Sequence, residues 1–183
     1  MTFLKIFNMR KLILIVVMFI SPTLVAPTIP VEDVEIIKTE PTISEHDQFL
    51  NDIGFRESGN RYTIVNEFGY MGKYQFGKAT LRTLKIKVTK DAFLNSPDLQ
   101  EYAMEQNLIY NKKKLLKYIK LYEGETVHGI FITESGILAA AHLAGPGSVR
   151  KFFRRGSEFK DGFGTSMTSY LKEFSGYDLK VDI

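Results

Sequence analysis

The chain has 183 residues, of which 44% are hydrophobic and 25% are charged, a size and composition typical of one folded domain rather than two. Three of its 24 basic residues lie in residues 1–26, which contain no acid, so the rest of the chain carries 21 basic and 21 acidic residues. This balance gives no reason to expect nucleic-acid binding. The chain contains no cysteine, which excludes disulfides, a cysteine nucleophile and a lipid-anchored cysteine.

Residues 1–26 have the three-part pattern of a secretory signal. Basic residues precede an apolar run from Leu12 to Ile20, and Ser-Pro and small residues follow it. The run is shorter than the roughly 20 residues of a membrane-spanning helix. We therefore expect an exported protein of the periplasm or cell envelope, or a secreted one. In the alternative, the segment stays uncleaved and tethers the chain to a membrane through its N-terminus.

Residues 27–43 contain three prolines and no clear hydrophobic period, which predicts a linker. The folded domain is then expected over residues 44–183. Ser44 is a good N-cap for a helix that ends near Ser58 and Gly59. Residues 60–77 are expected to form a loop or short hairpin, and a short helix is predicted over about 78–85.

Ser96-Pro97 opens a long predicted helix that runs to about residue 122, because proline is tolerated at the first helical position. Its expected core stripe consists of Leu99, Tyr102, Leu108, Ile109, Leu116 and Ile119. This helix is the longest element predicted, so the domain is expected to be mainly α.

Three further helices are predicted near the end of the chain. Thr133 caps the alanine-rich stretch "ESGILAAAHLA", which Gly145-Pro146-Gly147 ends, and a short helix follows over about 148–154. Ser166 caps "MTSYLKEF", which Gly176 closes. Strand signal is confined to 62–76 and, more weakly, to 127–132.

The stretch "FRESGNRYTIVNEFGYMGKYQFG", residues 55–77, has the composition of a carbohydrate site. Glu57 is expected at a helix C-terminus, where the helix dipole disfavours negative charge, and neighbouring aromatic rings would bury it. A carboxylic acid that keeps its proton can donate it to a leaving oxygen, as cleavage of a glycosidic bond requires. The structural alternative is a surface glutamate beside a glycine-rich turn. The residues expected to contact a sugar are glycines, amides and tyrosines: Gly69, Gly72, Asn60, Asn66, Gln75, Tyr62, Tyr70 and Tyr74.

Three blocks of sequence, "ESGN", "NEFGYMGKYQF" and "AAAHLAGPGSV", resemble the lysozyme-like superfamily of soluble lytic transglycosylases and goose-type lysozymes. They occur in the family's order and span residues 45 to about 155. The resemblance implies an α+β, lysozyme-like fold: a single helical domain with a small β-hairpin or loop lining the substrate cleft. It also implies a monomer that binds peptidoglycan glycan strands and uses no cofactor.

The resemblance assigns roles to individual residues. Glu57 matches the family's catalytic acid, and Ser58 is the serine beside it. Gly69, Gly72 and Gln75 match a Gly-x-x-Gly-x-x-Gln block. His142 stands where the family usually has tyrosine, and Leu143 where it has asparagine. The substrate-binding residues expected on these grounds are Ser58, Asn66, Gly69, Tyr70, Gly72, Tyr74, Gln75 and His142.

The chemistry implied by the resemblance is cleavage of the β-1,4 bond between N-acetylmuramic acid and N-acetylglucosamine. Glu57 would protonate the glycosidic oxygen and then accept the proton of the muramic 6-hydroxyl, which closes a 1,6-anhydro ring. A muramidase of the same fold would instead need a second carboxylate. The candidates are Glu67, expected as a solvated hairpin acid, and Asp161, expected as a turn or cap residue. A non-catalytic wall-binding or assembly protein is a further alternative.

The histidines do not suggest a metal site, because His46, His128 and His142 lie far apart in the sequence. For His142, on an alanine-rich helix, a packed core position is favoured over a catalytic one, although its matched position in the family faces the cleft.

Overall fold

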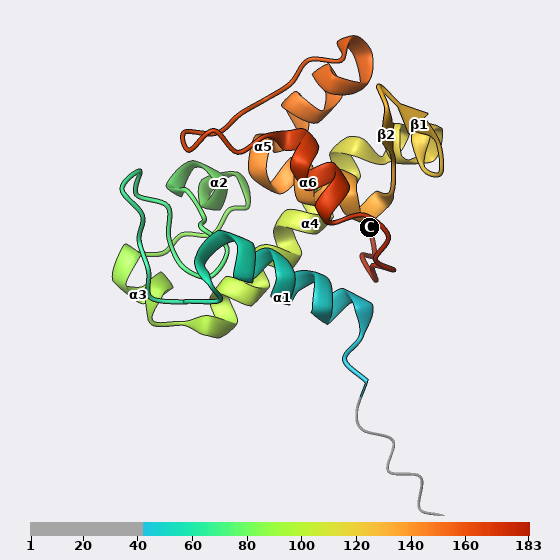
Figure 1. Cartoon of the computed structure of the whole chain (residues 1–183). Coiled ribbons are helices and arrows are strands. Elements are labelled where there is room, and N and C mark those ends of the chain that lie inside the picture. Colours follow the sequence, from blue (N-terminus) through green and yellow to red (C-terminus); the bar gives the residue numbers. More distant parts are fainter. Residues whose placement is uncertain (1–41) are drawn as a thin grey trace, which may run out of the picture. The chain divides into compact units, whose positions relative to one another are not determined.

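The computed structural model describes residues 42–183 (Figure 1). Within this range the chain forms six helices and one two-stranded sheet. The elements are α1 (Glu45–Ser58), α2 (Lys78–Thr83), α3 (Lys90–Leu94), α4 (Pro97–Tyr122), β1 (Thr126–Val127), β2 (Ile130–Phe131), α5 (Glu134–Arg155) and α6 (Met167–Glu173). The prediction of a mainly helical fold is confirmed. The predicted signal segment 1–26, and the linker up to residue 41, lie outside the described residues.

Four helices, α1, α4, α5 and α6, begin at the caps that their sequences predict. The hydroxyl of Ser44 accepts from the backbone N–H of Asp47, and the hydroxyls of Ser96, Thr133 and Ser166 accept in the same way three residues on. These bonds satisfy backbone donors that have no partner inside the helix. α3 was not predicted, yet Thr89 caps it by the same contact.

The core is centred on α5, which packs against both α4 and α6. Residues 137–141 of α5 are all buried. The predicted end of this helix is present as a break: Gly145 has φ 73° and ψ 156°, so the helical segments before and after it point in different directions. Glycine suits this position because a side chain would strain a positive φ. No helix within residues 42–183 combines the length and the apolar composition that a membrane span requires.

The predicted core stripe of α4 is partly wrong. Leu108 and Ile119 are buried, but Tyr102 is 54% exposed. Three amides occupy the buried face instead: Gln100, Asn107 and Asn111. Gln100 shows the reason, because its side chain accepts from the backbone of Lys73 and donates to two backbone carbonyls. α4 therefore packs partly against loop backbone that needs hydrogen-bond partners, rather than against an apolar surface.

Of the two alternatives predicted for residues 60–77, the structure has the loop and not the short hairpin. This segment contains only isolated bridges, from Val65 to Met71 and from Met71 to Phe76. The backbone turns at Gly69, Gly72 and Gln75, all at positive φ, too often for a ladder to extend. Among the described residues the hairpin is β1–β2, which pairs Thr126 with Phe131 and Val127 with Ile130.

Candidate active site

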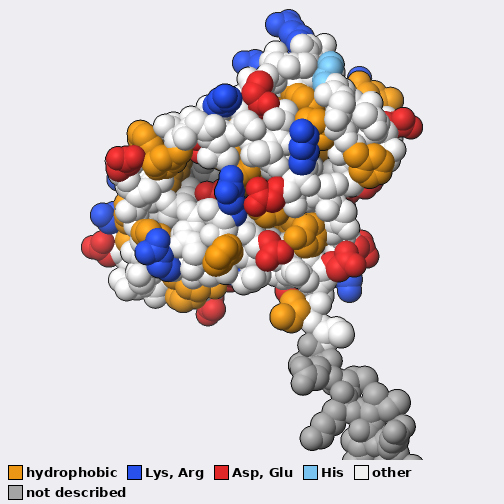
Figure 2. All heavy atoms as spheres, viewed as in Figure 1, with side chains coloured by type: hydrophobic (Ala, Val, Ile, Leu, Met, Phe, Trp, Pro, Cys, Tyr) orange, Lys and Arg blue, Asp and Glu red, His pale blue; other side chains and the backbone are white. Residues whose placement is uncertain are grey.

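A pocket of about 940 Å³ lies between the end of α1, the 66–77 loop, α2, the middle of α4, α5 and the 159–165 loop. Figure 2 shows a hollow in the upper left of the described surface, and acidic and basic side chains are interspersed on the face it shows. Neither strand of the hairpin β1–β2 contributes to the pocket wall. The loop over 66–77 lines it instead, which is the loop alternative of the predicted hairpin or loop.

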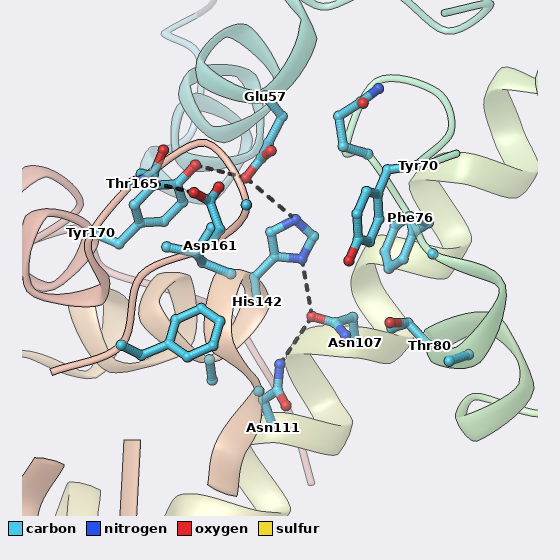
Figure 3. Close-up of a pocket in the computed structure, with 18 of the residues that line it drawn as sticks. Glu57, Tyr70, Phe76, Thr80, Asn107, Asn111, His142, Asp161, Thr165 and Tyr170 are labelled. Atoms are coloured by element: carbon cyan, nitrogen blue, oxygen red, sulfur yellow. Dashed lines mark hydrogen bonds and ion pairs between the residues drawn. The ribbon is translucent and has the colours of Figure 1, made fainter. Parts of the chain in front are cut away.

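Glu57 lies in the pocket wall, at the penultimate position of α1. The helix ends there because Gly59 takes a left-handed conformation and returns its N–H to the helix. The Glu57 side chain is only 15% exposed. Its Oε1 accepts the hydroxyl of Tyr170 at 2.7 Å and lies 3.8 Å from His142 Nε2 (Figure 3). No group in residues 42–183 donates to Oε2, so one carboxylate oxygen is held and the other is free.

Tyr170, on α6, was not predicted as a site residue. Burial, together with the charge of Glu57 and the hydrogen bond to it, raises the pKa of Tyr170 well above its ordinary value. Its hydroxyl therefore remains a donor to Glu57 at any working pH. The sequence predicts the helix that carries Tyr170, but no local pattern shows which of its side chains meets a residue so far back in the chain.

His142 lines the pocket and is also a packed residue. Its Nε2 lies 3.0 Å from the carbonyl oxygen of Tyr74, which can only accept, so this nitrogen carries a hydrogen. Its ring packs edge-on against Phe76. Burial lowers the pKa of His142 below its ordinary value, although the nearby Glu57 acts in the opposite direction. The imidazole is therefore neutral at neutral pH.

Three of the predicted loop residues also line the pocket: Asn66, Tyr70 and Gln75. Asn66 Oδ1 accepts the backbone N–H groups of Phe68 and Tyr70, both at 3.0 Å, and so shapes the loop tip. The side chain of Gln75 donates to the carbonyl of Gly72 at 2.8 Å. The ring of Tyr70 is exposed and stands at the pocket wall (Figure 3).

Six residues predicted to bind or contact a sugar do not line the pocket: Ser58, Asn60, Tyr62, Gly69, Gly72 and Tyr74. The buried hydroxyl of Ser58 donates to the carbonyl of Lys73 at 2.8 Å and accepts the N–H of Arg61, which ties the end of α1 to the loop. A Cβ atom at Gly72 would clash with the side chain of Gln100, so this glycine allows α4 to approach. Gly69 serves the loop turn through its positive φ.

Tyr74 belongs to a second polar cluster, away from the pocket, with Tyr62, Lys73 and Glu101. The Glu101 carboxylate accepts from both tyrosine hydroxyls and from Lys73 Nζ, which lies 2.9 Å away. Burial alone would raise the pKa of Glu101, but these three donors together lower it. Burial and the bond to Glu101 raise the pKa of Tyr62 to about 12. The cluster joins α4 to the 60–77 loop.

Of the two candidate second carboxylates, Asp161 lines the pocket and Glu67, which is exposed, does not. Asp161 Oδ1 accepts the backbone N–H groups of Phe163 at 2.9 Å and Thr165 at 2.7 Å, the turn role that was expected. The ring of Phe163 meets Phe68 edge-on at 4.8 Å between centroids. This contact joins the two loops that border the pocket.

The part of the chain that the structure describes holds no group of three His, Cys, Asp or Glu side chains placed to bind a metal ion. In comparisons with known proteins, no protein-family model matches this chain, and neither a curated protein nor a solved structure matches it.

Proposed function

We propose that this chain is a peptidoglycan lytic transglycosylase with a lysozyme-like fold. It would cut the bond between N-acetylmuramic acid and N-acetylglucosamine with Glu57 as its single catalytic carboxylate. The observation that carries the proposal is the state of Glu57: mostly buried in a pocket wall, with Oε1 held by Tyr170 and Oε2 free. The resemblance of the three sequence blocks to lytic transglycosylases supports it. Export to the cell envelope, action on glycan strands as a monomer and the absence of a cofactor are parts of the same proposal.

The hydrogen bond from Tyr170 suits an acid that must act twice. Because Oε1 accepts the tyrosine hydroxyl, the proton of the neutral acid resides on Oε2. Oε2 gives this proton to the glycosidic oxygen as the bond from C1 to that oxygen breaks. The substrate's acetamido oxygen stabilises the positive charge at C1. The muramic 6-hydroxyl then attacks C1 and returns its proton to Oε2, so the product is a 1,6-anhydro sugar and no water is consumed.

His142 is a poor candidate for the base in this reaction. Its Nε2 hydrogen is donated to the Tyr74 carbonyl, and burial lowers the pKa of the ring. The remaining nitrogen, Nδ1, faces Asn107 rather than Glu57. We therefore assign both proton transfers to Glu57, as a one-carboxylate mechanism requires.

A muramidase is the second candidate, and one observation favours it: Asp161 lies in the same pocket as Glu57. Only its Oδ1 takes part in the turn, and no group in the described residues donates to Oδ2. A carboxylate in that position could orient a water molecule for hydrolysis.

Mass spectrometry of the soluble products released from purified peptidoglycan by the full-length protein tests the proposal. Anhydro-muropeptides are the expected result. Reducing-end muropeptides would favour the muramidase, and their loss on Asp161→Asn but not on Glu67→Gln would identify its second acid. A folded protein that binds the wall and releases no products would overturn both enzymatic assignments in favour of a wall-binding or assembly protein.

A further inference from the structure

Two asparagines on α4 line the pocket although both are almost completely buried. Asn107 is 4% exposed and Asn111 is 1% exposed. They stand four residues apart, so they share one face of the helix. The buried neighbours on α4 include Ala103, Met104, Leu108, Leu115 and Ile119. Burial of an amide among apolar side chains costs free energy unless its polar groups find partners. Any amide group that lacks a partner within the protein is therefore a candidate to bind a ligand.

The structure supplies only some of those partners. Asn111 Nδ2 donates to Asn107 Oδ1 at 2.9 Å, and His142 Nδ1 lies 3.3 Å from the same oxygen (Figure 3). No group in residues 42–183 pairs with Asn107 Nδ2 or with Asn111 Oδ1. Neither atom is sealed from solvent, because the side-chain atoms in the described residues that are sealed and lack a hydrogen bond belong to His46, Asn60 and Glu134. Both atoms are therefore accessible in the pocket wall.

The free groups are one donor and one acceptor whichever way the amides are turned. If both side chains rotate by 180°, Asn107 Nδ2 donates to His142 Nδ1 and to Asn111 Oδ1. Asn107 Oδ1 and Asn111 Nδ2 are then free. This second arrangement suits a neutral imidazole, whose Nδ1 accepts. Both arrangements present an NH₂ group at one end of the hydrogen-bonded pair and a carbonyl oxygen at the other.

We propose that Asn107 and Asn111 form a subsite that binds a secondary amide, and that its ligand is the acetamido group of an N-acetylated sugar. The sugar assignment rests on the proposed function. In a trans secondary amide the N–H and C=O point in opposite directions, which matches free groups at opposite ends of the asparagine pair. A sugar with a hydroxyl in the place of the acetamido group would leave the free NH₂ group or the free carbonyl oxygen of the asparagine pair without a hydrogen bond. Because an unsatisfied buried polar group costs free energy, such a sugar should bind more weakly.

The subsite is separate from the acid. His142 lies between Glu57 and the asparagine pair, and the contacts run from Glu57 through His142 and Asn107 to Asn111 (Figure 3). Asn107 and Asn111 therefore select and position the glycan and take no part in proton transfer.

Binding of three neutral probes to the full-length protein, measured by titration calorimetry, tests the proposal. Tri-N-acetylchitotriose carries acetamido groups, cellotriose carries hydroxyls in their place, and N-acetyl-alanine methylamide carries amides without a sugar. The wild-type protein should prefer tri-N-acetylchitotriose to cellotriose roughly tenfold, the effect of one unpaired buried polar group. Asn111→Leu should abolish that preference. The matched control is Asn95→Leu, an exposed residue after α3 that does not line the pocket.

Circular dichroism establishes that each variant is folded, and Asn111→Ser replaces Asn111→Leu if the larger side chain prevents folding. An unchanged preference in a folded Asn111 variant overturns the subsite, as does equal binding of the two trioses by the wild type, or failure of the wild type to bind any of the three probes. Binding of the capped alanine without binding of tri-N-acetylchitotriose overturns the sugar assignment. Product analysis separates the two proposals. If the wild type cleaves peptidoglycan and the Asn111 variant keeps the wild-type preference for tri-N-acetylchitotriose, the subsite alone is overturned. If the Asn111 variant loses that preference but the wild type cleaves no peptidoglycan, the enzymatic function alone is overturned.

Discussion

Tyr170 donates its hydroxyl to Glu57 Oε1 at 2.7 Å across 113 residues of sequence, which joins α6 to the C-terminal end of α1. The contact does two things. It supplies a partner to a carboxylate that the fold has largely removed from water, and it leaves the second oxygen of that carboxylate free for chemistry. Because the pKa of Tyr170 is raised, first by burial and then by Glu57, the hydroxyl keeps its hydrogen.

Tyr170→Phe should therefore destabilise the protein. The substitution keeps the ring beside Phe174 but removes the donor to a mostly buried acid. A buried acceptor left without its partner costs about 1–3 kcal/mol, and urea unfolding should show a loss in this range. Tyr102→Phe, at an exposed position of α4, is the control and should change the free energy of unfolding very little. Equal stability of the two variants would mean that the bond to Glu57 contributes nothing.

Glu57→Gln should abolish lytic activity without unfolding the protein. Glutamine keeps the shape of the side chain and still accepts from Tyr170, but it cannot deliver a proton to the glycosidic oxygen. General acid–base catalysis contributes about 10²–10⁴-fold, so release of soluble muropeptides should fall by at least that range. Glu67→Gln, an exposed acid of the neighbouring loop, should retain full activity. If Glu57→Gln kept full activity, Glu57 would not be the catalytic acid.

The stability of the wild-type protein should fall as the pH drops below about 6.5, the ordinary pKa of histidine. Burial lowers the pKa of His142, so the unfolded chain takes up this proton at a higher pH than the folded protein does. The neutral ring of His142 therefore contributes its full share of stability above about pH 6.5. This contribution is lost as the pH falls toward the pKa that His142 has in the folded protein. One proton limits the slope to about 1.4 kcal/mol per pH unit. Chemical denaturation between pH 5 and 7 should show that the free energy of unfolding depends less on pH in His142→Gln than in the wild type. The same pH dependence in both proteins would contradict this account.

Glu101→Leu should destabilise the protein more than Lys73→Met does. Loss of the carboxylate leaves Lys73 and two tyrosine hydroxyls without their shared acceptor, whereas loss of the lysine leaves Glu101 with both tyrosines. Removal of one partner from a buried ion pair costs about 3–5 kcal/mol. Because Glu101 is partly exposed, we expect about 2–3 kcal/mol for Glu101→Leu. Thermal and urea unfolding of both variants would show the order, and a reversed order would mean that the lysine rather than the acid organises the cluster.

Phe163→Ala should loosen the pocket border locally. The edge-on contact with Phe68 joins the 66–70 and 160–165 loops, and aromatic pairs of this kind contribute about 0.5–1.5 kcal/mol. Amide hydrogen exchange should accelerate in both loops while the core of α5 remains protected. Phe131→Ala removes a similarly exposed ring from β2 and should leave these loops unchanged. Faster exchange confined to 160–165 would show that the rings do not couple the loops.

Local sequence patterns predicted the features of this protein that depend on residues close together in the chain. Ser44, Ser96, Thr133 and Ser166 begin helices because each hydroxyl meets a backbone N–H three residues on. Glu57 is placed at the end of α1 for an equally local reason, the left-handed conformation of Gly59. The break at Gly145 depends on the backbone freedom of a single residue.

Tertiary structure decided which side chains meet. The apolar period of α4 could not show that Asn107 and Asn111 lie on its buried face, because their partners are each other and a histidine of α5. The sequence around Ser58 and Tyr74 resembled a binding motif, yet the fold engages both side chains in its own hydrogen bonds. The physical reason is the same throughout: a cap is satisfied within one helical turn, whereas the environment of a buried polar side chain depends on groups that only packing brings close to it.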